Sequence, residues 1–268
     1  MVRASSAPER VERLATISDI RETGPETTDI TETLKSARPD IIFHLAATYI
    51  PGAGPADISA LATGNIELTA RLCEAACAAG CATIVSAGTA WQNAASPPGD
   101  DTPAPNAVYA VTKQAADELI DHYVRAAGLR AVTLNIYDSY GPEDPRRKFL
   151  TVLAEAAAEG ETLRGTPGDQ RLHMVHVDDI VDGFVHAANL LVSKDVGSRD
   201  SFTLPSAKSV TLRTLAETWQ NATHTSLNIE WGALPERPGD VVTPWDRTPL
   251  PGWTPRINLE DGLRSLSA

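Results

Sequence analysis

The chain has 268 residues, of which 42% are hydrophobic and 22% are charged, which suits one soluble α/β domain with a smaller lobe. Its formal net charge of −12 argues against binding to nucleic acid or to an anionic membrane, because both attract basic surfaces. The sequence holds no long apolar run and no signal-peptide pattern, so we expect a cytoplasmic protein that does not enter a membrane.

Apolar runs bounded by turn residues alternate with helical patterns in the first half of the chain. Strands are expected at 11–17, 41–45, 83–86 and 130–136, and helices at 28–36, 58–79 and 108–127. This alternation predicts an α/β fold with a Rossmann-type parallel sheet.

After Gly141 the expected elements become shorter and mixed in type. Helices are expected at 149–158, 180–191 and 212–219, with strands at 174–177 and 201–204. We therefore divide the chain into a dinucleotide-binding domain at 1–141 and a mainly substrate-binding lobe at 142–268. Some segments of the second part are expected to return to the main sheet.

Tyr109 and Lys113 lie four residues apart and so share one face of the helix expected at 108–127. An ammonium group there can lower the pKa of the phenol, which could then exchange a proton with a carbinol or carbonyl oxygen at neutral pH. The spacing alone is weak, since it recurs on many solvated helix faces. Two upstream strand patterns strengthen it, because 39–47 ends in small residues and 83–89 ends in hydroxyls.

Several segments together resemble the extended short-chain dehydrogenase/reductase family of NAD-dependent epimerases and dehydratases. Besides the Tyr-x-x-x-Lys motif, these are 135–142 (NIYDSYGP), 176–179 (HVDD), 237–240 (RPGD) and 252–255 (GWTP). The resemblance covers nearly all of the chain from Val11 onward, and it is closest to the CDP-abequose/paratose synthase-like 4-ketoreductases. It implies an NAD or NADP cofactor, a nucleotide-sugar substrate and a homodimer.

The same resemblance implies specific roles for the site residues. Tyr109 is the expected general acid/base, and Lys113 is expected to lower its pKa and to bind the nicotinamide ribose. Thr89 is the better candidate for the hydroxyl that holds the same substrate oxygen, and Ser86 is the fallback. Thr89 could also be a plain strand-end hydroxyl that bonds the backbone.

The resemblance also implies which residues contact the cofactor and which contact the substrate. Asp19, as part of an Asp-hydrophobic pair that reaches the adenine, could equally cap a turn. The residues expected at the cofactor are Arg3, Asp19, Ile20, Leu45, Ala46, Ala47, Tyr109 and Lys113. The residues expected at the substrate are Thr89, Trp91, Asp138, Arg171 and Arg237.

Two features depart from the family pattern on the substrate side. Asp138 replaces an asparagine, and because a carboxylate would repel a diphosphate we expect it to contact another group. Arg171 comes one position early for the family's phosphate-binding arginine, which on a strand reverses its face. Arg237 fits a second such arginine, and a guanidinium suits bidentate binding of phosphate. The basic run at 146–148 could equally be the solvated start of a helix.

The remaining polar candidates are interpreted as structural. His44 is expected to be packed or hydrogen-bonded, and Asn65 to support the site. Cys73, Cys77 and Cys81 would share one face of a helix, but they stand among alanines and are expected in the core, so we predict no metal site.

The family's glycine-rich turn, which binds the dinucleotide pyrophosphate, has no counterpart near the N-terminus. Residues 1–6 resemble the end of the family's second strand, so the first strand, glycine turn and first helix are expected to be missing. Either the start of the chain is assigned too late or the protein lacks half of its cofactor cradle. In the second case NAD(P) binding is expected to be weak or absent.

Three functions remain open from the sequence. The first is an NAD(P)-dependent 4-keto-deoxyhexose reductase or epimerase acting on nucleotide sugars in sugar or secondary-metabolite biosynthesis. The second is a redox-neutral cyclase, lyase or isomerase that uses the same Tyr/Lys/Thr site without nicotinamide, which the missing glycine turn favours. The third, a non-catalytic partner subunit, is the weakest because it has no need of these three residues in register.

Overall fold

The computed structural model describes residues 12, 14–16, 18–19, 21, 27–97, 99–144, 146–236 and 241–267. Its larger lobe is a parallel sheet covered by helices, and these strands and helices come from both halves of the chain. These elements are α2 (Thr27–Ala37), β1 (Ile42–His44), the 3₁₀ turn η1 (Pro55–Asp57), α3 (Ile58–Leu61), the π-helical turn η2 (Ala62–Glu67), α4 (Leu68–Ala79), β2 (Thr83–Thr89), the 3₁₀ turn η3 (Ala90–Asn93), α5 (Val108–Ala127), β3 (Arg130–Ile136), α7 (Val177–Val192) and β8 (Arg199–Leu204).

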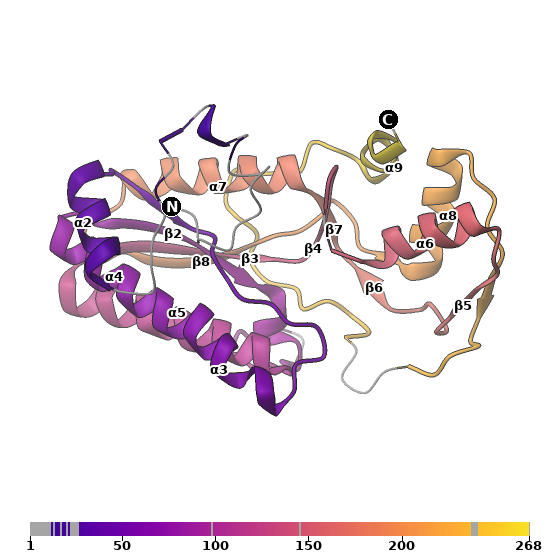
Figure 1. The fold of residues 1–268 in the computed structure, drawn as a ribbon, viewed down its shortest axis with the longest axis horizontal. Coiled ribbons are helices and arrows are strands. Elements are labelled where there is room, and N and C mark those ends of the chain that lie inside the picture. Colours follow the sequence, from indigo (N-terminus) through magenta and orange to yellow (C-terminus); the bar gives the residue numbers. More distant parts are fainter. Residues whose placement is uncertain are drawn as a thin grey trace.

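The main sheet is parallel, with the strand order β1-β2-β3-β8. Helices α2, α4 and α5 cover one of its faces and α7 covers the other (Figure 1). The predicted α/β fold with a parallel sheet is confirmed. Helix α7 and strand β8 belong to this lobe although they come late in the chain.

The expected strand at 11–17 is wrong in the part that the structure describes. Glu12, Leu14 and Ala15 are helical, and Leu14 is exposed. An apolar run becomes a strand only when a neighbour pairs with its backbone, and no described strand pairs with this one. Among the described residues β1 pairs with β2 alone, so it forms an edge of the sheet.

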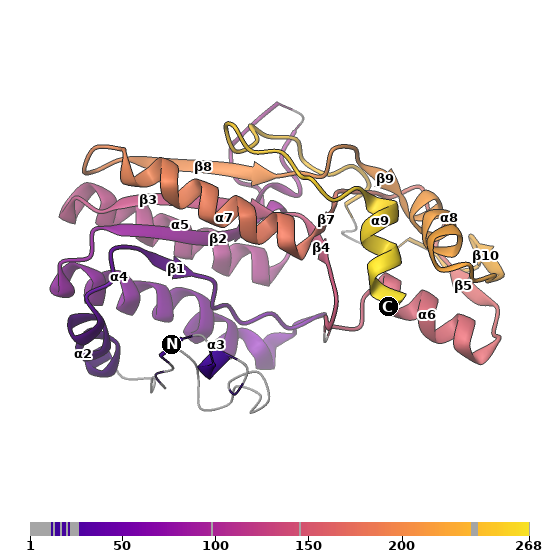
Figure 2. The same cartoon turned by 90° about the horizontal axis from the view of Figure 1, so that it is seen from above.

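The smaller lobe lies beyond the carboxyl ends of the main strands (Figure 2). Leu153, Leu215, Trp219 and Leu263 are among the residues that form its core. Its elements are β4 (Asp138–Tyr140), α6 (Phe149–Glu159), β5 (Leu163–Gly165), β6 (Arg171–Leu172), β7 (Met174–His176), β9 (Val210–Thr211), α8 (Leu212–Thr223), β10 (Ile229–Trp231), α9 (Leu259–Arg264) and the 3₁₀ turn η4 (Ser265–Ser267).

The helix expected at 58–79 is interrupted by the π-helical turn η2. Gly64 and Asn65 lie in this turn, and both are buried. A Cβ atom on Gly64 would lie 1.9 Å from Oγ1 and 2.7 Å from Cβ of Thr48, so only glycine lets the loop after β1 approach so closely. Single π turns of this kind are often found at functional sites.

The three cysteines do not share one helix face, because Gly80 ends α4 in the left-handed conformation before Cys81. Cys73 and Cys81 are buried in the core under α2, α4 and α5. Burial raises the pKa of Cys73 to about 12, which keeps it a protonated and unreactive thiol at neutral pH. No helix within the described ranges is long and apolar enough to cross a membrane.

Candidate active site

The candidate residues meet at the carboxyl end of the parallel sheet. Thr89 is the last residue of β2, and its partner in register is Ile136 at the end of β3. The chain leaves β1 through Leu45, Ala46 and Ala47, of which Leu45 and Ala46 are exposed. In open α/β sheets, ligands bind outside this end of the strands.

Lys113 belongs to the face of α5 that packs on the sheet. Ala110, Ala116, Ile120 and Val124 of the same face are all buried, and the helical period places Lys113 among them. The side chain of Lys113 is only 5% exposed, and within the described residues its Nζ atom makes no hydrogen bond. Burial lowers the pKa of Lys113 to about 8, although the nearby carboxylate of Asp117 raises it in part.

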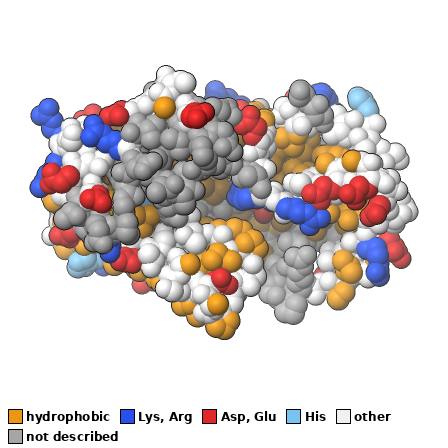
Figure 3. Space-filling view, in the orientation of Figure 1, with side chains coloured by type: hydrophobic (Ala, Val, Ile, Leu, Met, Phe, Trp, Pro, Cys, Tyr) orange, Lys and Arg blue, Asp and Glu red, His pale blue; other side chains and the backbone are white. Residues whose placement is uncertain are grey.

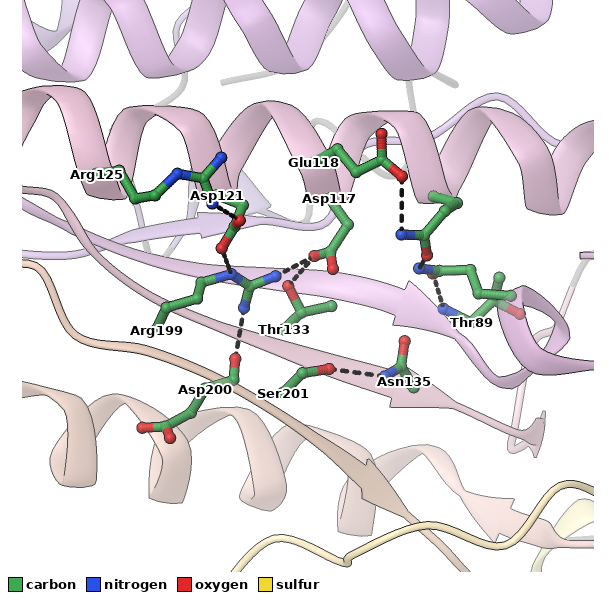
Figure 4. A network of polar contacts seen from close by, with 12 residues as sticks. Thr89, Asp117, Glu118, Asp121, Arg125, Thr133, Asn135, Arg199, Asp200 and Ser201 are labelled. Atoms are coloured by element: carbon green, nitrogen blue, oxygen red, sulfur yellow. Dashed lines mark hydrogen bonds and ion pairs between the residues drawn. The ribbon is translucent and has the colours of Figure 1, made fainter. Parts of the chain in front are cut away.

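Asp117 is shared with a second basic residue, one turn further along α5. Its Oδ1 atom accepts hydrogen bonds from Arg199 and from the Thr133 hydroxyl, both at 2.5 Å. Figure 4 shows this network between α5 and the strands β3 and β8. Because Arg199 partly neutralises Asp117, that carboxylate is a weak counter-ion for Lys113.

Tyr109 lies in the first turn of α5, and its ring is packed edge-on against Tyr49, with 5.0 Å between ring centroids. Burial raises the pKa of the Tyr109 phenol, and Tyr49 raises it further, whereas the charge of Arg146 lowers it. The phenol is therefore protonated at neutral pH. The lowering of this pKa by Lys113 that the sequence suggests stays a prediction.

Asn65 connects three segments around Tyr109. Its side chain accepts a hydrogen bond from the Thr48 amide at 2.7 Å and donates to the Thr48 carbonyl at 3.0 Å and to the Thr112 hydroxyl at 2.8 Å. That hydroxyl in turn donates to the Tyr109 carbonyl at 2.8 Å. Asn65 thus holds Tyr49, which follows Thr48, against the first turn of α5, in agreement with the supporting role expected for it.

Thr89 is buried at the point where β2 becomes the turn η3. Its hydroxyl accepts a hydrogen bond from the Trp91 amide at 3.3 Å, and its own amide donates to the Gln92 side chain at 2.9 Å. The hydroxyl can still donate to a ligand, so both expectations for Thr89 remain open. Ser86 is buried three residues deeper in the strand, and Trp91 is 38% exposed.

Close packing of β2 on β3 explains the glycine next to Thr89. A Cβ atom on Gly88 would lie 2.3 Å from Asn135 Oδ1 and 2.7 Å from Thr133 Cγ2. Because glycine has no side chain, the side chains of β3 can lie close to the end of β2 that carries Thr89.

His44 is a packed histidine, as expected. It is 4% exposed, and its Nε2 atom is 2.8 Å from the Thr69 hydroxyl, which donates to the Asn65 carbonyl. The ring therefore supports the π turn that carries Asn65.

Asp138 stands beside basic residues in the loop between β4 and α6. Burial raises its pKa, while Lys148 and Arg146 lower it. Lys148 donates to the Ser139 carbonyl at 2.5 Å, and its ammonium group lies 3.1 Å from Asp144. In the space-filling view, basic side chains lie where the two lobes meet, next to acidic side chains over α6 (Figure 3).

The guanidinium of Arg171 is used inside the smaller lobe. It donates to the Ser209 carbonyl at 2.7 Å and to the Ser209 hydroxyl at 3.0 and 3.1 Å, across the antiparallel pair of β6 and β9. Within the described residues, the hydrogen bonds of the Arg171 guanidinium thus go to Ser209 and not to Tyr109 or Thr89.

The structure tests few of the remaining expected residues. Arg3, Ile20 and Arg237 are outside the described residues. Asp19 is described and exposed, and it forms an ion pair with Arg21 at 2.9 Å. Their roles at the cofactor and substrate stay predictions.

Sequence reasoning missed Tyr49 and the pairing of Arg146 with Asp144. Tyr49 had a signal, since it follows the small residues 46–47 at the end of a strand. The sequence carried no signal for the position of Arg146, because this residue lies in an irregular loop where no helical or strand periodicity predicts its contacts.

Residues 3–199, well over half of the chain, match the model of the "NAD dependent epimerase/dehydratase family". The chain belongs to this family. The resemblance stated from the sequence is confirmed.

Similar proteins and structures agree with this assignment. The chain is 28% identical over 173 residues to CDP-abequose synthase of Yersinia pseudotuberculosis. The aligned region covers 65% of this chain but only 58% of that protein. It is 29% identical over 255 residues to UDP-glucose 4-epimerase of Mycolicibacterium smegmatis, with 88% and 77% covered. The structure of MoeE5 in complex with UDP-glucuronic acid and NAD superposes with a TM-score of 0.76 at 25% identity, with 92% of this chain and 84% of that chain covered.

Proposed function

We propose that this family member is an NAD(P)-dependent nucleotide-sugar oxidoreductase that reduces a 4-keto-deoxyhexose or epimerises the same carbon. The observation that carries the proposal is the position of Tyr109 and Lys113. They lie one turn apart at the carboxyl end of the sheet, with the ammonium group buried in the apolar face of α5.

The buried Lys113 fits a nicotinamide dinucleotide. Burying an ammonium group in an apolar face costs free energy unless hydrogen-bond acceptors surround it. The ribose hydroxyls of a bound dinucleotide are such acceptors. Leu45, Ala46 and Ala47 lie at the same end of the sheet, and their small or exposed side chains leave room for a ring system. We propose that these residues and Lys113 hold the nicotinamide half of the cofactor.

A bound nicotinamide would supply the hydride that adds to the carbonyl carbon. Tyr109 would donate its phenolic proton to the carbonyl oxygen, so that one hydride and one proton convert the ketone into an alcohol. Thr89 would donate a hydrogen bond to the same oxygen. The raised pKa of Tyr109 supports the reductase form of the proposal, because an epimerase must first remove a proton from a hydroxyl group.

The proposal is tested by incubating the chain with CDP-4-keto-6-deoxyglucose and NADPH or NADH. We expect loss of the nicotinamide absorbance together with a product two hydrogens heavier by mass spectrometry. With Tyr109→Phe, neither the loss of absorbance nor the product should be detected. UDP- and dTDP-linked 4-keto sugars would identify the preferred nucleotide. Conversion that proceeds equally well with no nicotinamide present would overturn the proposal in favour of redox-neutral chemistry, and binding without any conversion would favour a partner subunit.

A further inference from the structure

A buried glutamine holds the end of strand β2. Gln92, the third residue of the turn η3, is only 3% exposed. Its Oε1 atom accepts a hydrogen bond from the Thr89 amide at 2.9 Å, and the Thr89 hydroxyl accepts one from the Trp91 amide at 3.3 Å. A Cβ atom on Gly88 would lie 3.1 Å from the same Oε1 atom, so the carboxamide packs directly on the strand end. These contacts form a capping box that holds both the backbone and the side chain of Thr89.

The other end of the Gln92 carboxamide is bonded to helix α5. Its Nε2 atom donates to Oε1 of Gln114 at 2.9 Å, and Nε2 of Gln114 donates to Glu118 at 3.3 Å. Thr89 and Glu118 are thus the two ends of one chain of hydrogen bonds (Figure 4). The chain runs from the buried end of β2 to an exposed carboxylate on α5.

The direction of this chain is determined at both ends. The backbone N–H of Thr89 can only donate, and the carboxylate of Glu118 can only accept. Each carboxamide between them has one oxygen and one NH₂ group, so a single orientation of the two amides satisfies all three bonds. A reversed Gln92 amide would place its NH₂ group against the N–H of Thr89. The oxygen that Gln114 presents therefore decides which atom Gln92 turns toward Thr89.

The Thr89 hydroxyl keeps one function for a ligand. Its bond with the Trp91 amide uses a lone pair of the oxygen and leaves the hydroxyl hydrogen available. Because the amide and the hydroxyl oxygen of Thr89 are both held, rotation of its side chain is restricted. The hydrogen is thus donated from a defined position at the carboxyl end of the sheet.

We propose that Gln92 is a positioning residue, whose carboxamide, oriented by Gln114, holds Thr89 in the side-chain rotamer that directs its hydroxyl at the substrate oxygen. The inference rests on the proposed role of Thr89 at that oxygen. Gln92 acts through the Thr89 amide and does not itself touch the substrate. Since Gln114 directly follows Lys113, the helix that carries the proton donor also orients the hydroxyl of the neighbouring strand.

The first experiment measures the rotamer of Thr89 by NMR in the full chain, with no substrate or cofactor added. Three-bond couplings from the Thr89 methyl carbon to the backbone nitrogen and to the carbonyl carbon report this rotamer. The methyl signal is identified by its loss in Thr89→Ala. We expect the couplings of a single rotamer in the parent chain. In Gln92→Met, which keeps the length of the side chain and removes both hydrogen bonds, we expect rotamer-averaged couplings.

Position 114 tests the direction of the hydrogen-bond chain. Gln114→Glu keeps an acceptor for Gln92, so the Thr89 couplings should stay those of a single rotamer. Gln114→Lys offers only donors and no longer holds the Gln92 amide in its orientation, so the couplings should be averaged. A role in packing alone predicts the same couplings in both variants, and that result would overturn the proposal.

Gln220→Met is the matched control in the smaller lobe. Oε1 of Gln220 accepts a hydrogen bond from the Leu227 amide at 2.7 Å, so the same substitution removes the same kind of bond away from the site. Urea unfolding should show a loss of stability in Gln220→Met as in Gln92→Met, whereas the Thr89 couplings should change only in Gln92→Met. Averaged couplings in the control would mean that any loss of stability loosens Thr89, and would overturn the proposal.

A double-mutant cycle in the reductase assay tests whether Gln92 acts through the Thr89 hydroxyl. We expect Thr89→Ala to lower kcat by about 10²-fold, as for the loss of one donor to a developing oxyanion. Gln92→Met should lower kcat by about tenfold, the effect of one hydrogen bond, with KM unchanged. In the Thr89→Ala chain it should have no further effect, and a second tenfold loss there would overturn the proposal.

The two experiments separate failure of the inference from failure of the proposed function. Unchanged Thr89 couplings in Gln92→Met would overturn the inference alone, because they need no turnover. Turnover that is unchanged in Thr89→Ala would instead overturn the proposed role of Thr89, and the inference with it.

Discussion

Helix α5 and the loop that leads into α6 both carry charged residues, but these residues are held in place in different ways. On α5 a single helical period places Tyr109 and Lys113, and the apolar residues of the same face bury the lysine. In the loop, Arg146 is held by hydrogen bonds to Asp144 and Ser139, and no regular spacing of residues in the sequence predicts them. The comparison teaches that a helical period places side chains that the sequence alone can predict, whereas contacts between irregular segments place side chains that it cannot.

The largest effect is expected at the locally defined group. Tyr109→Phe keeps the ring that packs on Tyr49 and removes only the ionisable hydroxyl, so turnover should fall by about 10²–10⁴-fold. The melting temperature should stay close to that of the unchanged chain. Both are measured on the same preparation, by the reductase assay and by differential scanning calorimetry.

Tyr123→Phe is the matched control on the same helix. The Tyr123 hydroxyl bonds Glu74 at 2.9 Å near the surface, away from the end of the sheet. Its removal should leave turnover unchanged. An equal loss in both variants would contradict a catalytic role for Tyr109.

Lys113→Met should separate the function of the lysine from its cost to the fold. The unfolded chain releases this proton near pH 10.5 and the folded chain near pH 8, so between these values the unfolded state binds more protons and stability rises with pH. At neutral pH the buried charge therefore costs stability, and the variant should be more stable by up to about 3 kcal/mol. Turnover should be strongly reduced.

The pH dependence gives the check on Lys113. Urea unfolding of both chains from pH 7 to 10.5 should show the advantage of Lys113→Met shrinking above pH 8. An advantage that stays constant over this range would mean that the folded lysine does not titrate near pH 8.

Asn65→Ala is expected to weaken the connection between the loop after β1 and α5. The change leaves the Thr48 amide and the Thr112 hydroxyl without their partner, at a cost of about 1–3 kcal/mol for a buried group. Urea unfolding measures it. Asn189→Ala, at an exposed position of α7, is the control and should lie within about 0.5 kcal/mol of the parent chain.

An effect on stability no larger than that of Asn65→Ala is expected from the close approach at Gly64. Gly64→Ala places a methyl group against both Oγ1 and Cβ of Thr48, so rotation of the hydroxyl cannot relieve the contact, and we expect a loss of about 1–3 kcal/mol. Gly54→Ala has no atom within 4 Å of the added Cβ and an ordinary φ of −110°, so it should be neutral or slightly stabilising. Thermal unfolding of the pair compares them, and equal melting temperatures would show that the loop yields easily.

Regular elements with a clear period are the part of the fold that the sequence predicts well. The bounds expected for the helix at 108–127 and the strand at 130–136 agree with α5 and β3. The short strands β4, β5, β6, β9 and β10 and the helix α9 were missed, because pieces of two to six residues are too short to show a period. The interruption of the helix at 58–79 was missed because it depends on Thr48, which is distant in sequence.

The sequence by itself determined that Tyr109 and Lys113 share one face of a helix, because the spacing of these two residues and their apolar neighbours is a property of one helix. Tertiary structure alone decided the environment of that pair. Asn65 joins the loop after β1 to helix α5, which only folding brings together. The physical reason is that a pKa depends on burial and on every charge nearby in space, and neither is encoded in the local order of residues.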